Sequence, residues 1–314
     1  MAKEHTVGIE QAQAFLASHL GVGVSEVVRI GEGAWSRCFG FTYGGQHLVI
    51  RFGKYVSDFQ KDRLAHTYAT PDLPIPEVLE IGQAMDGYYA ISRRVYGVPL
   101  ESVNAGQWLA LVPAVVAVLE AMRTADLSAT EGFGDWGADG NGACSSWSHR
   151  LLSTGEDTPD QRGHGWRQRL AESPQGEATF EWGFDLLKKV ADDVVPRSLL
   201  HCDLTNRNVL VNGNQITGVL DWGCSVYGDH LYELAWFEFW APWHLSLDME
   251  PLRSAIEQRW AEKGYRPENE KPRVMACYLH IGLEHIAYNA HLGNWTTLLA
   301  VAKRMRALVT QHLA

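Results

Sequence analysis

Residues 201–208 read HCDLTNRN, and DWG at residues 221–223 begins thirteen residues after the last Asn of that segment. Between them, Val209–Val211 and Gln215–Leu220 are predicted strands joined by an Asn-Gly turn, which is typical of a β-hairpin. A hairpin returns the chain to the edge from which it started, so the Asn and the Asp that flank it are expected at the same end. Each polar side chain alone is typical of a capped turn or a strand end, but three of them at this spacing favour a shared site.

The residue types at this site suit phosphoryl transfer. That reaction needs a carboxylate that accepts or orients the proton of the attacking hydroxyl, and oxygen ligands that hold Mg²⁺ on nucleotide phosphates. We predict that Asp203 is the catalytic carboxylate and contacts the acceptor. Asn208 and Asp221 are predicted to be catalytic as the metal ligands. The predicted cofactors are Mg²⁺ and ATP, with GTP left open.

The N-terminal part is predicted to form strands over Val27–Ile30, Cys38–Tyr43 and Gln46–Phe52. Along the third strand, Val49 and Arg51 share one face. A basic residue near the end of a third strand binds nucleotide phosphate in kinases, and an Arg can bind two oxygens at once. We therefore predict that Arg51 binds phosphate and that Val49 lines the adenine pocket. The alternative for Arg51 is an ordinary surface position.

The turn before the second strand carries Gly31, Gly33 and Ser36. Glycines let backbone N–H groups approach phosphate oxygens, and a serine can add its hydroxyl. We predict that these three residues bind the nucleotide phosphates, because the turn lies two strands before Arg51. A closer match to a phosphate-binding G-x-G-x-x-G, at 132–137, has no strand before it and is interpreted as a surface loop near the acceptor.

Residues 58–70 are predicted to form a helix that the following prolines end. Asp62, early in this helix, has two interpretations. It pairs with Arg51, as an acidic helix residue pairs with the phosphate-binding lysine of kinases, or it is an ordinary surface charge between Lys61 and Arg63. The sequence leaves both open.

The remaining patterns divide the chain into two unequal parts. Beyond residue 100 the apolar spacing is mostly helical, apart from the hairpin. We predict an α+β, bilobal protein-kinase-like fold. A small β-rich nucleotide-binding lobe is expected over residues 1–96, and a larger, mostly helical catalytic and acceptor-binding lobe over 97–314. The other predicted segments are strands at Val78–Ile81 and Tyr88–Val95, helices at Gly106–Ala125, Phe180–Val194 and from Leu231 onward, and loops at Gly132–Gly142 and 155–178.

Six segments of the chain resemble the aminoglycoside phosphotransferase family. The resemblance covers most of the chain, and its PIPEVL, ISRR and GFG elements are more specific than the catalytic-loop motif. It implies transfer of the ATP γ-phosphate to a hydroxyl of an aminocyclitol antibiotic, which confers resistance. It also implies that Ser92 and Arg93 lie in the hinge beside adenine. The segments are Ile30–Phe41, Lys61–Gly82, Ile91–Leu100, Ala125–Gly142, His201–Val211 and Ile216–Trp240.

A cationic antibiotic needs carboxylates that hold its ammonium groups. Glu238 stands in an aromatic segment with Trp240, and we predict that both contact the acceptor; the alternative is an aromatic core beside an exposed Glu238. Glu284, on a later predicted helix, is a further candidate. Asp229 is interpreted as a helix cap before Leu231. Between His201 and Leu245 the chain has a single base, Arg207, and five acids: Asp203, Asp221, Asp229, Glu233 and Glu238.

The charge of the chain also favours a cationic partner. The 314 residues carry a net charge of −10, of which residues 1–96 hold −1 and residues 97–314 hold −9. Such acidity argues against binding to nucleic acid or an anionic membrane. The longest apolar run, about 12 residues, is too short to span a bilayer, and no signal-peptide pattern begins the chain. We expect a cytoplasmic monomer with a cationic small-molecule substrate.

Two other functions stay open from the sequence. The first is a kinase for another small acceptor, such as a macrolide or a metabolite; a neutral macrolide would favour an apolar cleft over an acidic one. The second is a catalytically inactive nucleotide-binding regulator. The presence together of Asp203, Asn208 and Asp221 argues against an inactive protein.

Overall fold

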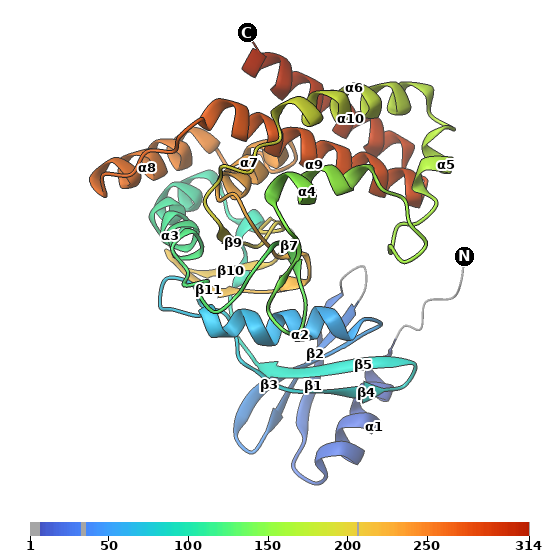
Figure 1. Ribbon diagram of the computed structural model, residues 1–314. Helices are drawn as coiled ribbons and strands as arrows, with labels where there is room; N and C mark the ends of the chain where they lie inside the picture. Colours follow the sequence, from blue (N-terminus) through green and yellow to red (C-terminus); the bar gives the residue numbers. More distant parts are fainter. Residues whose placement is uncertain (1–6, 33–35, 206, 314) are drawn as a thin grey trace.

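The computed structural model describes residues 7–32, 36–205 and 207–313. Its N-terminal lobe is built on a five-stranded antiparallel sheet with the strand order β1-β2-β3-β5-β4 (Figure 1). Alternating apolar and polar residues form these strands because successive side chains point to opposite faces of a sheet. The predicted strands are confirmed, with ends that differ by a few residues. They are β1 Ser25–Glu32, β2 Ser36–Tyr43, β3 Gln46–Gly53, β4 Val78–Ala84 and β5 Gly87–Arg93.

The two faces of this sheet have different roles. Helix α1, Ile9–Leu20, buries Ala12 and Leu16 against the face that carries Ile50, and these residues form a small apolar core. Helix α2, Val56–Ala65, lies between the sheet and the larger lobe (Figure 1). It confirms the first part of the predicted helix over 58–70. The short 3₁₀ turn η1, His66–Tyr68, follows it.

The larger lobe is mostly helical, as predicted, and surrounds a second and larger apolar core. The two C-terminal helices, α9 and α10, lie side by side, and α6 packs against both (Figure 1). The helices are α3 Ala105–Arg123, α4 Trp147–Leu152, α5 Trp166–Leu170, α6 Pro174–Val190, α7 Leu231–Trp240, α8 Met249–Glu262, α9 Glu270–Leu292 and α10 Trp295–Leu313. The described part of this lobe also has 3₁₀ turns at η2 Leu100–Ser102, before α3, and at η3 Ser153–Gly155, η4 Trp222–Cys224 and η5 Ala241–Trp243.

Helix α3 is the one described helix that is long and apolar enough to cross a membrane by length and composition. Its buried residues include Trp108, Leu111, Val115 and Met122, which belong to the larger core. The spacing of these residues by three, four and seven positions places them on one side of a helix. This is the pattern of a helix packed inside a folded domain.

Two small sheets of the larger lobe carry the segments that the sequence predicts to be functional. The first has the order β11-β10-β6 and the second β8-β7-β12-β9. Residues 94–97 join β5 to β6, and a Cβ atom added to Gly97 would lie 2.8 Å from the backbone oxygen of Val211 on β10. Only glycine allows the link to approach the hairpin this closely. The strands are β6 Val98–Pro99, β7 Phe133–Trp136, β8 Gly142–Cys144, β9 Ser198–Leu200, β10 Val209–Asn212, β11 Gln215–Val219 and β12 Val226–Gly228.

Two of the predicted loops are wrong in part. The glycine-rich segment Gly132–Gly142 contains strand β7 and the first residue of β8, and β7 pairs with β12. Trp136 in this segment is buried, so the strand part is not a surface loop, whereas the turn at 137–141 is mostly exposed. The segment 155–178 contains α5 and the first turn of α6. The division at residues 96 and 97 falls in the link between the lobes and stays a prediction.

Candidate active site

The hairpin that predicts the site has the expected geometry. Strands β10 and β11 are antiparallel, with Val209 opposite Val219, and the backbone N–H of Leu220 donates to the backbone oxygen of Asn208 at 2.7 Å. Asn208 therefore lies across the hairpin from the residue that precedes Asp221. Asp221 has a φ of 60°, in the left-handed region, which is uncommon for a residue other than glycine. Such backbone is retained only where the surrounding structure holds it, and active sites are frequent places for it.

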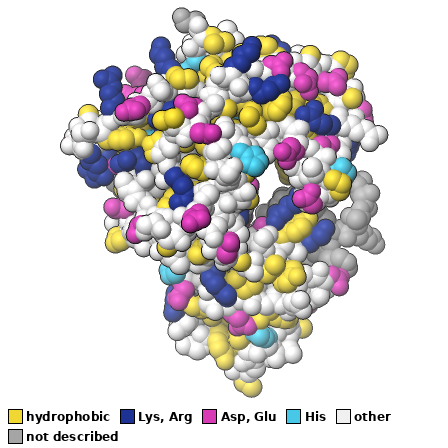
Figure 2. All heavy atoms as spheres, viewed as in Figure 1, with side chains coloured by type: hydrophobic (Ala, Val, Ile, Leu, Met, Phe, Trp, Pro, Cys, Tyr) yellow, Lys and Arg dark blue, Asp and Glu magenta, His cyan; other side chains and the backbone are white. Residues whose placement is uncertain are grey.

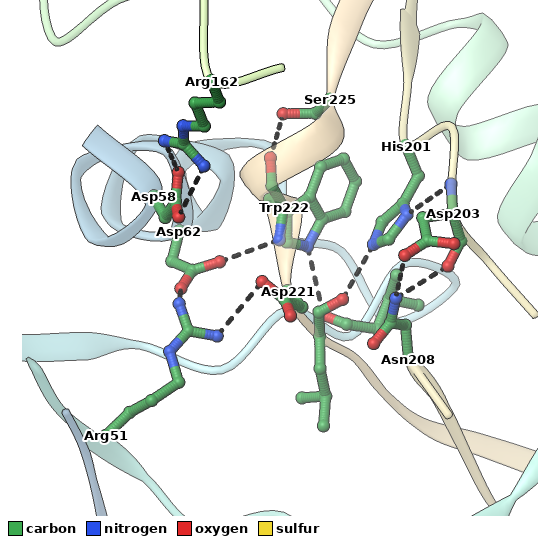
Figure 3. Close-up of polar contacts among 12 residues, drawn as sticks. Arg51, Asp58, Asp62, Arg162, His201, Asp203, Asn208, Asp221, Trp222 and Ser225 are labelled. Carbon is green, nitrogen blue, oxygen red and sulfur yellow. Dashed lines mark hydrogen bonds and ion pairs between the residues drawn. The ribbon is translucent and has the colours of Figure 1, made fainter. Parts of the chain in front are cut away.

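The loop before the hairpin is organised by a buried, neutral histidine. The Nε2 atom of His201 lies 2.8 Å from the backbone oxygen of Leu220, and its Nδ1 accepts a hydrogen bond from the N–H of Asp203 at 3.2 Å (Figure 3). Because Nδ1 is an acceptor, Nε2 is the nitrogen that carries hydrogen. Burial lowers the pKa of His201 to about 4. The imidazole thus joins the loop of Asp203 to the strand end before Asp221.

Asp203 and Asn208 are held together within this loop. The Nδ2 atom of Asn208 donates to the backbone oxygen of Asp203 at 2.8 Å and to its carboxylate Oδ2 at 3.1 Å (Figure 3). Since both amide hydrogens are used in this way, Oδ1 is the atom of Asn208 left to act as a ligand. The structure therefore brings together the three side chains that the sequence predicts to be catalytic.

A buried carboxylate on α7 binds the backbone at the start of the loop 201–208. Glu233, on α7, accepts hydrogen bonds through Oε1 from the backbone N–H groups of His201 and Cys202. Within the described part of the chain, its Oε2 atom has no hydrogen-bond partner. Burial raises the pKa of Glu233 to about 7, although both backbone N–H groups oppose the shift. Glu233, one of the five acids between His201 and Leu245, therefore holds the loop and is not available to an acceptor.

Arg51 and Asp62 form the ion pair that the sequence left open. Nη2 of Arg51 donates to Oδ2 of Asp62, and Nη1 donates to Oδ1 of Asp221 at 3.3 Å (Figure 3). The other oxygen of Asp62 accepts a hydrogen bond from the N–H of Trp222 at 2.8 Å. Burial raises the pKa of Asp62 to about 6, even though the charge of Arg51 lowers it. Arg51 is therefore a cleft residue, and its guanidinium lies beside the candidate metal ligand Asp221.

The predicted adenine-side residues fall on two faces of the sheet. Val49 is paired with Ser92 across β3 and β5, so both lie on the face of Arg51, toward the cleft. Arg93 is paired with Leu48 and lies on the opposite face, where its Nε donates to Glu77 at 2.9 Å. The N–H of Arg93 is also used, since it donates to the backbone oxygen of Glu77, the residue before β4, at 3.0 Å. A contact of the Arg93 side chain with adenine is therefore not supported.

The predicted phosphate turn is described only at its ends. Gly31 lies in β1, paired with Cys38, and Ser36 is the first residue of β2, paired with Gly53. Gly33 lies outside the described residues. Both described residues lie at the strand ends that flank the turn.

A layer of carboxylates lies over buried cations on the larger lobe. Asp135 accepts a hydrogen bond from Lys61 at 3.1 Å, and Glu284 accepts one from Arg150 at 3.2 Å. The side chains of Asp135 and Glu284 are 56% and 39% exposed, whereas those of Lys61 and Arg150 are 9% and 15% exposed. Burial alone would raise the pKa of Asp135, but the charges of Lys61 and Arg150 outweigh burial and lower it. The ammonium group of Lys61 and the guanidinium of Arg150 are therefore buried, while the carboxylates of Asp135 and Glu284 are exposed to solvent.

Trp240 lies on the side of α7 that faces the catalytic loop. One turn before it, Trp236 donates from Nε1 to the hydroxyl of Thr205 in that loop, at 3.2 Å. The ring of Trp240 packs edge-on against His285, with centroids 4.7 Å apart, and the two rings stand on neighbouring helices. Trp240 and Glu284, the residue before His285, therefore lie on the same side of the larger lobe.

Glu238 points elsewhere, and its predicted role is corrected. Its carboxylate accepts hydrogen bonds from Nε of Arg253 at 2.6 Å and from the hydroxyl of Tyr278. These residues line a separate, open cavity of about 500 Å³ formed by residues of α7, α8, α9 and α10, and none of Asp203, Asn208 and Asp221 lines it. Apart from its two glutamates, helix α7 carries apolar and aromatic residues on every side, so its pattern does not predict the direction in which Glu238 points.

A contact between the lobes closes one side of the cleft. Arg162, in the loop that follows η3, donates to both carboxylate oxygens of Asp58 on α2, at 3.2 and 2.7 Å (Figure 3). Its guanidinium also lies over the ring of Tyr55, 3.8 Å from the centroid. On the face shown in Figure 2, the surface is hollowed where the two lobes meet, and charged side chains of both signs stand at its edge. The segment 155–178 thus contributes to the cleft.

The donor set fits a magnesium ion bound together with nucleotide phosphates. No group of three or more His, Cys, Asp and Glu side chains in the described part of the chain could hold a metal ion alone. Mg²⁺ on a nucleotide does not require such a group, because it takes one or two protein oxygens and completes its shell with phosphate oxygens and water. The half-exposed carboxylate of Asp221 and the amide oxygen of Asn208 meet that need.

The fold and the site together define a class of protein. A small antiparallel sheet, a short link, a helical lobe, and an Asp-Asn-Asp set facing a basic strand residue are the parts of a kinase-like phosphotransferase. The comparisons agree, since the sequence model of the phosphotransferase enzyme family APH matches residues 26–270. The chain belongs to this family.

The relatives make the assignment more specific. Hygromycin-B 4-O-kinase from Escherichia coli is 32% identical over 289 residues, which cover 91% of this chain and 81% of that protein. A thermostable mutant of aminoglycoside phosphotransferase APH(4)-Ia, crystallised with AMP-PNP and hygromycin B, superposes with a TM-score of 0.81 at 32% identity, over 95% of this chain and 97% of that chain. Spectinomycin phosphotransferase APH(9)-Ia, at 15% identity and a TM-score of 0.57 over 96% and 95% of the chains, shares the fold.

Proposed function

We propose that this enzyme transfers the γ-phosphoryl group of ATP to a hydroxyl of a cationic aminocyclitol antibiotic of the hygromycin B type, and so confers resistance to it. The observation that carries the proposal is the joint placement of Asp203, Asn208, Asp221 and Arg51 at the cleft between the lobes. The relative that is named a hygromycin-B kinase supports the acceptor class.

The reaction assigned to this site needs few groups. The acceptor oxygen forms a bond to the γ-phosphorus while the bond from that phosphorus to the bridging oxygen of ADP breaks. Asp203 accepts the proton that the acceptor hydroxyl loses, and ADP leaves with its negative charge. Little covalent chemistry falls to the protein, so positioning and electrostatics supply most of the rate.

The nucleotide side of the step rests on charge. When bound, Mg²⁺ would neutralise the negative charge of the phosphates, with Asn208 and Asp221 as its protein ligands. Arg51 adds a fixed guanidinium, which Asp62 holds in place through an ion pair. Arg51 thereby orients the phosphates and balances part of the charge that builds up on ADP.

The acceptor side rests on the layer of carboxylates. Asp135 and Glu284 present their oxygens to the cleft while their counterions lie beneath. Ammonium groups of an aminocyclitol can pair with these oxygens, and Trp240 supplies a flat apolar surface for a sugar ring. A neutral acceptor would gain nothing from this arrangement.

The test is a transfer assay with purified protein, Mg²⁺ and ATP on a panel of acceptors. Hygromycin B is the expected substrate, with release of ADP and addition of one phosphoryl group detected by mass spectrometry. The panel includes other aminoglycosides and an uncharged macrolide, and a reaction without any acceptor is the blank. Phosphorylation of the macrolide alone, or of no member of the panel, would refute the proposal. Growth of a sensitive host on hygromycin B, with and without the gene, tests resistance.

A further inference from the structure

We propose that Lys61 is a positioning residue for the loop that carries Asp221, and that it keeps this carboxylate where the magnesium–nucleotide complex binds. The proposal rests on the proposed function, because it takes Asp221 to be a metal ligand. Lys61 stands on α2 in the smaller lobe, whereas the groups that it contacts belong to the larger lobe.

The ammonium group of Lys61 has its three hydrogens matched by three acceptors. Its Nζ atom lies 3.1 Å from the backbone oxygen of Gly223, 3.0 Å from that of Ser225 and 3.1 Å from Oδ1 of Asp135. Lys61 is only 7% exposed. Lysine is rarely buried to this extent without a charged partner, because removal of its charge from water is costly. Here Asp135 supplies the charge and the two carbonyl groups complete the hydrogen bonds.

Two consecutive residues of α2 therefore hold the same loop. Asp62 accepts the N–H of Trp222, and Lys61 donates to the carbonyl groups of Gly223 and Ser225. Neighbouring residues on a helix point about 100° apart, so the two side chains reach the loop from different directions. One binds a donor of the loop and the other binds two acceptors. Together they fix the backbone that begins at Asp221.

This loop needs support from outside itself. Asp221 stands in the left-handed region at a φ of 60°, and its carboxylate is 49% exposed with Arg51 as an ion-pair partner. A strained residue of this kind keeps its conformation only when its surroundings over-determine it. The contacts of Lys61 lie two and four residues beyond Asp221, where they prevent η4 from moving away from α2.

The charge of Lys61 is also linked to the acceptor side. Asp135, which pairs with Lys61, lies 3.7 Å from Nε of Arg150, and Arg150 in turn pairs with Glu284. The loop of the metal ligand and the carboxylates of the acceptor side thus share one charge network. Removal of Lys61 would leave Asp135 with Arg150 as its remaining partner in this network.

Binding of AMP-PNP, measured by calorimetry with Mg²⁺ and again with EDTA, tests the proposal without turnover. The quantity of interest is the ratio of the metal-free Kd to the Kd with Mg²⁺. In Lys61→Met we expect this ratio to fall about tenfold, while the metal-free Kd changes less than twofold. Lys61→Arg, which keeps the charge and the donors, is expected to restore at least half of the lost ratio on a logarithmic scale. Lys188→Met is the matched control, because Lys188 forms an exposed pair with Asp185 on α6.

The outcomes separate the two proposals. If the wild-type protein binds AMP-PNP no better with Mg²⁺ than with EDTA, the proposed function fails. If the wild type shows the metal effect and Lys61→Met keeps it, the role of Lys61 is refuted. Should Lys61→Met not fold, Lys61→Gln replaces it with an expected fall of about threefold, and an unchanged ratio there refutes the role too. Faster amide exchange of residues 222–225 in the variant, at an unchanged rate in α10, is the expected independent sign.

Discussion

Asn208 donates a hydrogen bond from Nδ2 to the carboxylate of Asp203 at 3.1 Å, and the same nitrogen binds the backbone oxygen of Asp203 at 2.8 Å. The proposed base and one proposed metal ligand are therefore parts of one rigid turn. The spacing between the group that takes the proton and the charge that holds the phosphates is set within six residues of sequence.

The substitution Asp203→Asn should abolish transfer without loss of nucleotide binding. An amide can still accept the hydrogen bond from Asn208, so the loop keeps its shape, but it cannot take the proton of the acceptor hydroxyl. We expect kcat to fall by about 10²–10⁴-fold, the usual contribution of general base catalysis. Steady-state kinetics and AMP-PNP binding measure the two effects. Activity within tenfold of the wild type would contradict the assignment of Asp203 as the base.

Loss of the carboxylate at Asp62 should weaken the use of ATP more than that of the acceptor. Asp62→Ala releases Arg51 and leaves the N–H of Trp222 without its partner. We expect the KM for ATP to rise about tenfold, which is equivalent to about 1.4 kcal/mol. Arg63→Ala, at the exposed next position of α2, is the control and should leave this KM unchanged. If both variants change the KM for ATP equally, Asp62 has no specific role in holding Arg51.

Two glutamates on neighbouring helices should differ in their effect on the acceptor. Glu284→Gln removes a charge that faces the cleft, so the KM for a cationic acceptor is expected to rise about tenfold. Glu238→Gln removes a charge that Arg253 neutralises in a separate cavity, and the same KM should change less than twofold. The two variants change one atom each and preserve shape. The reverse order of effects would restore Glu238 as an acceptor residue.

The buried carboxylate of Glu233 should make stability depend on pH. Burial raises its pKa to about 7, above the ordinary value near 4.5. Between these two pH values, the folded protein keeps a proton on Glu233 that the unfolded chain has released. The stability that this proton brings is complete below about pH 4.5 and is lost as the pH rises to 7, by at most about 3 kcal/mol. Glu233→Gln cannot titrate. Urea unfolding should therefore show the wild type losing stability relative to the variant between pH 5 and 7.5, and parallel curves would exclude the shift.

The parts of the site that the sequence predicted correctly are those built by short-range geometry. The hairpin between Asn208 and Asp221 is set by a turn and two short strands, so spacing alone places the flanking side chains together. Alternation along β3 likewise placed Arg51 and Val49 on one face. The grouping of these side chains therefore followed from local rules, and the fold followed from the order of strands and helices.

The parts that were missed or wrong depend on contacts between distant segments. Lys61 and Asp135 lie 74 residues apart, and no periodicity connects a helix residue to a glycine-rich strand. Helix α1 was not predicted, because it buries little beyond Ala12 and Leu16. Glu238 was assigned to the cleft because aromatic residues on every side of α7 conceal which side is inward.

The two apolar cores of unequal size have a consequence for how the enzyme fails on heating. Arg51 stands on β3, in the sheet that carries the small core, while Asp203 and Asn208 stand in the lobe with the large core. Regions with few buried contacts open at a lower cost than the whole molecule. On heating, the smaller lobe is therefore expected to open and separate its side chains from those of the larger lobe. Activity should be lost while the helical lobe is still folded. A bound nucleotide contacts both lobes, so its presence is expected to raise the temperature at which the enzyme loses activity.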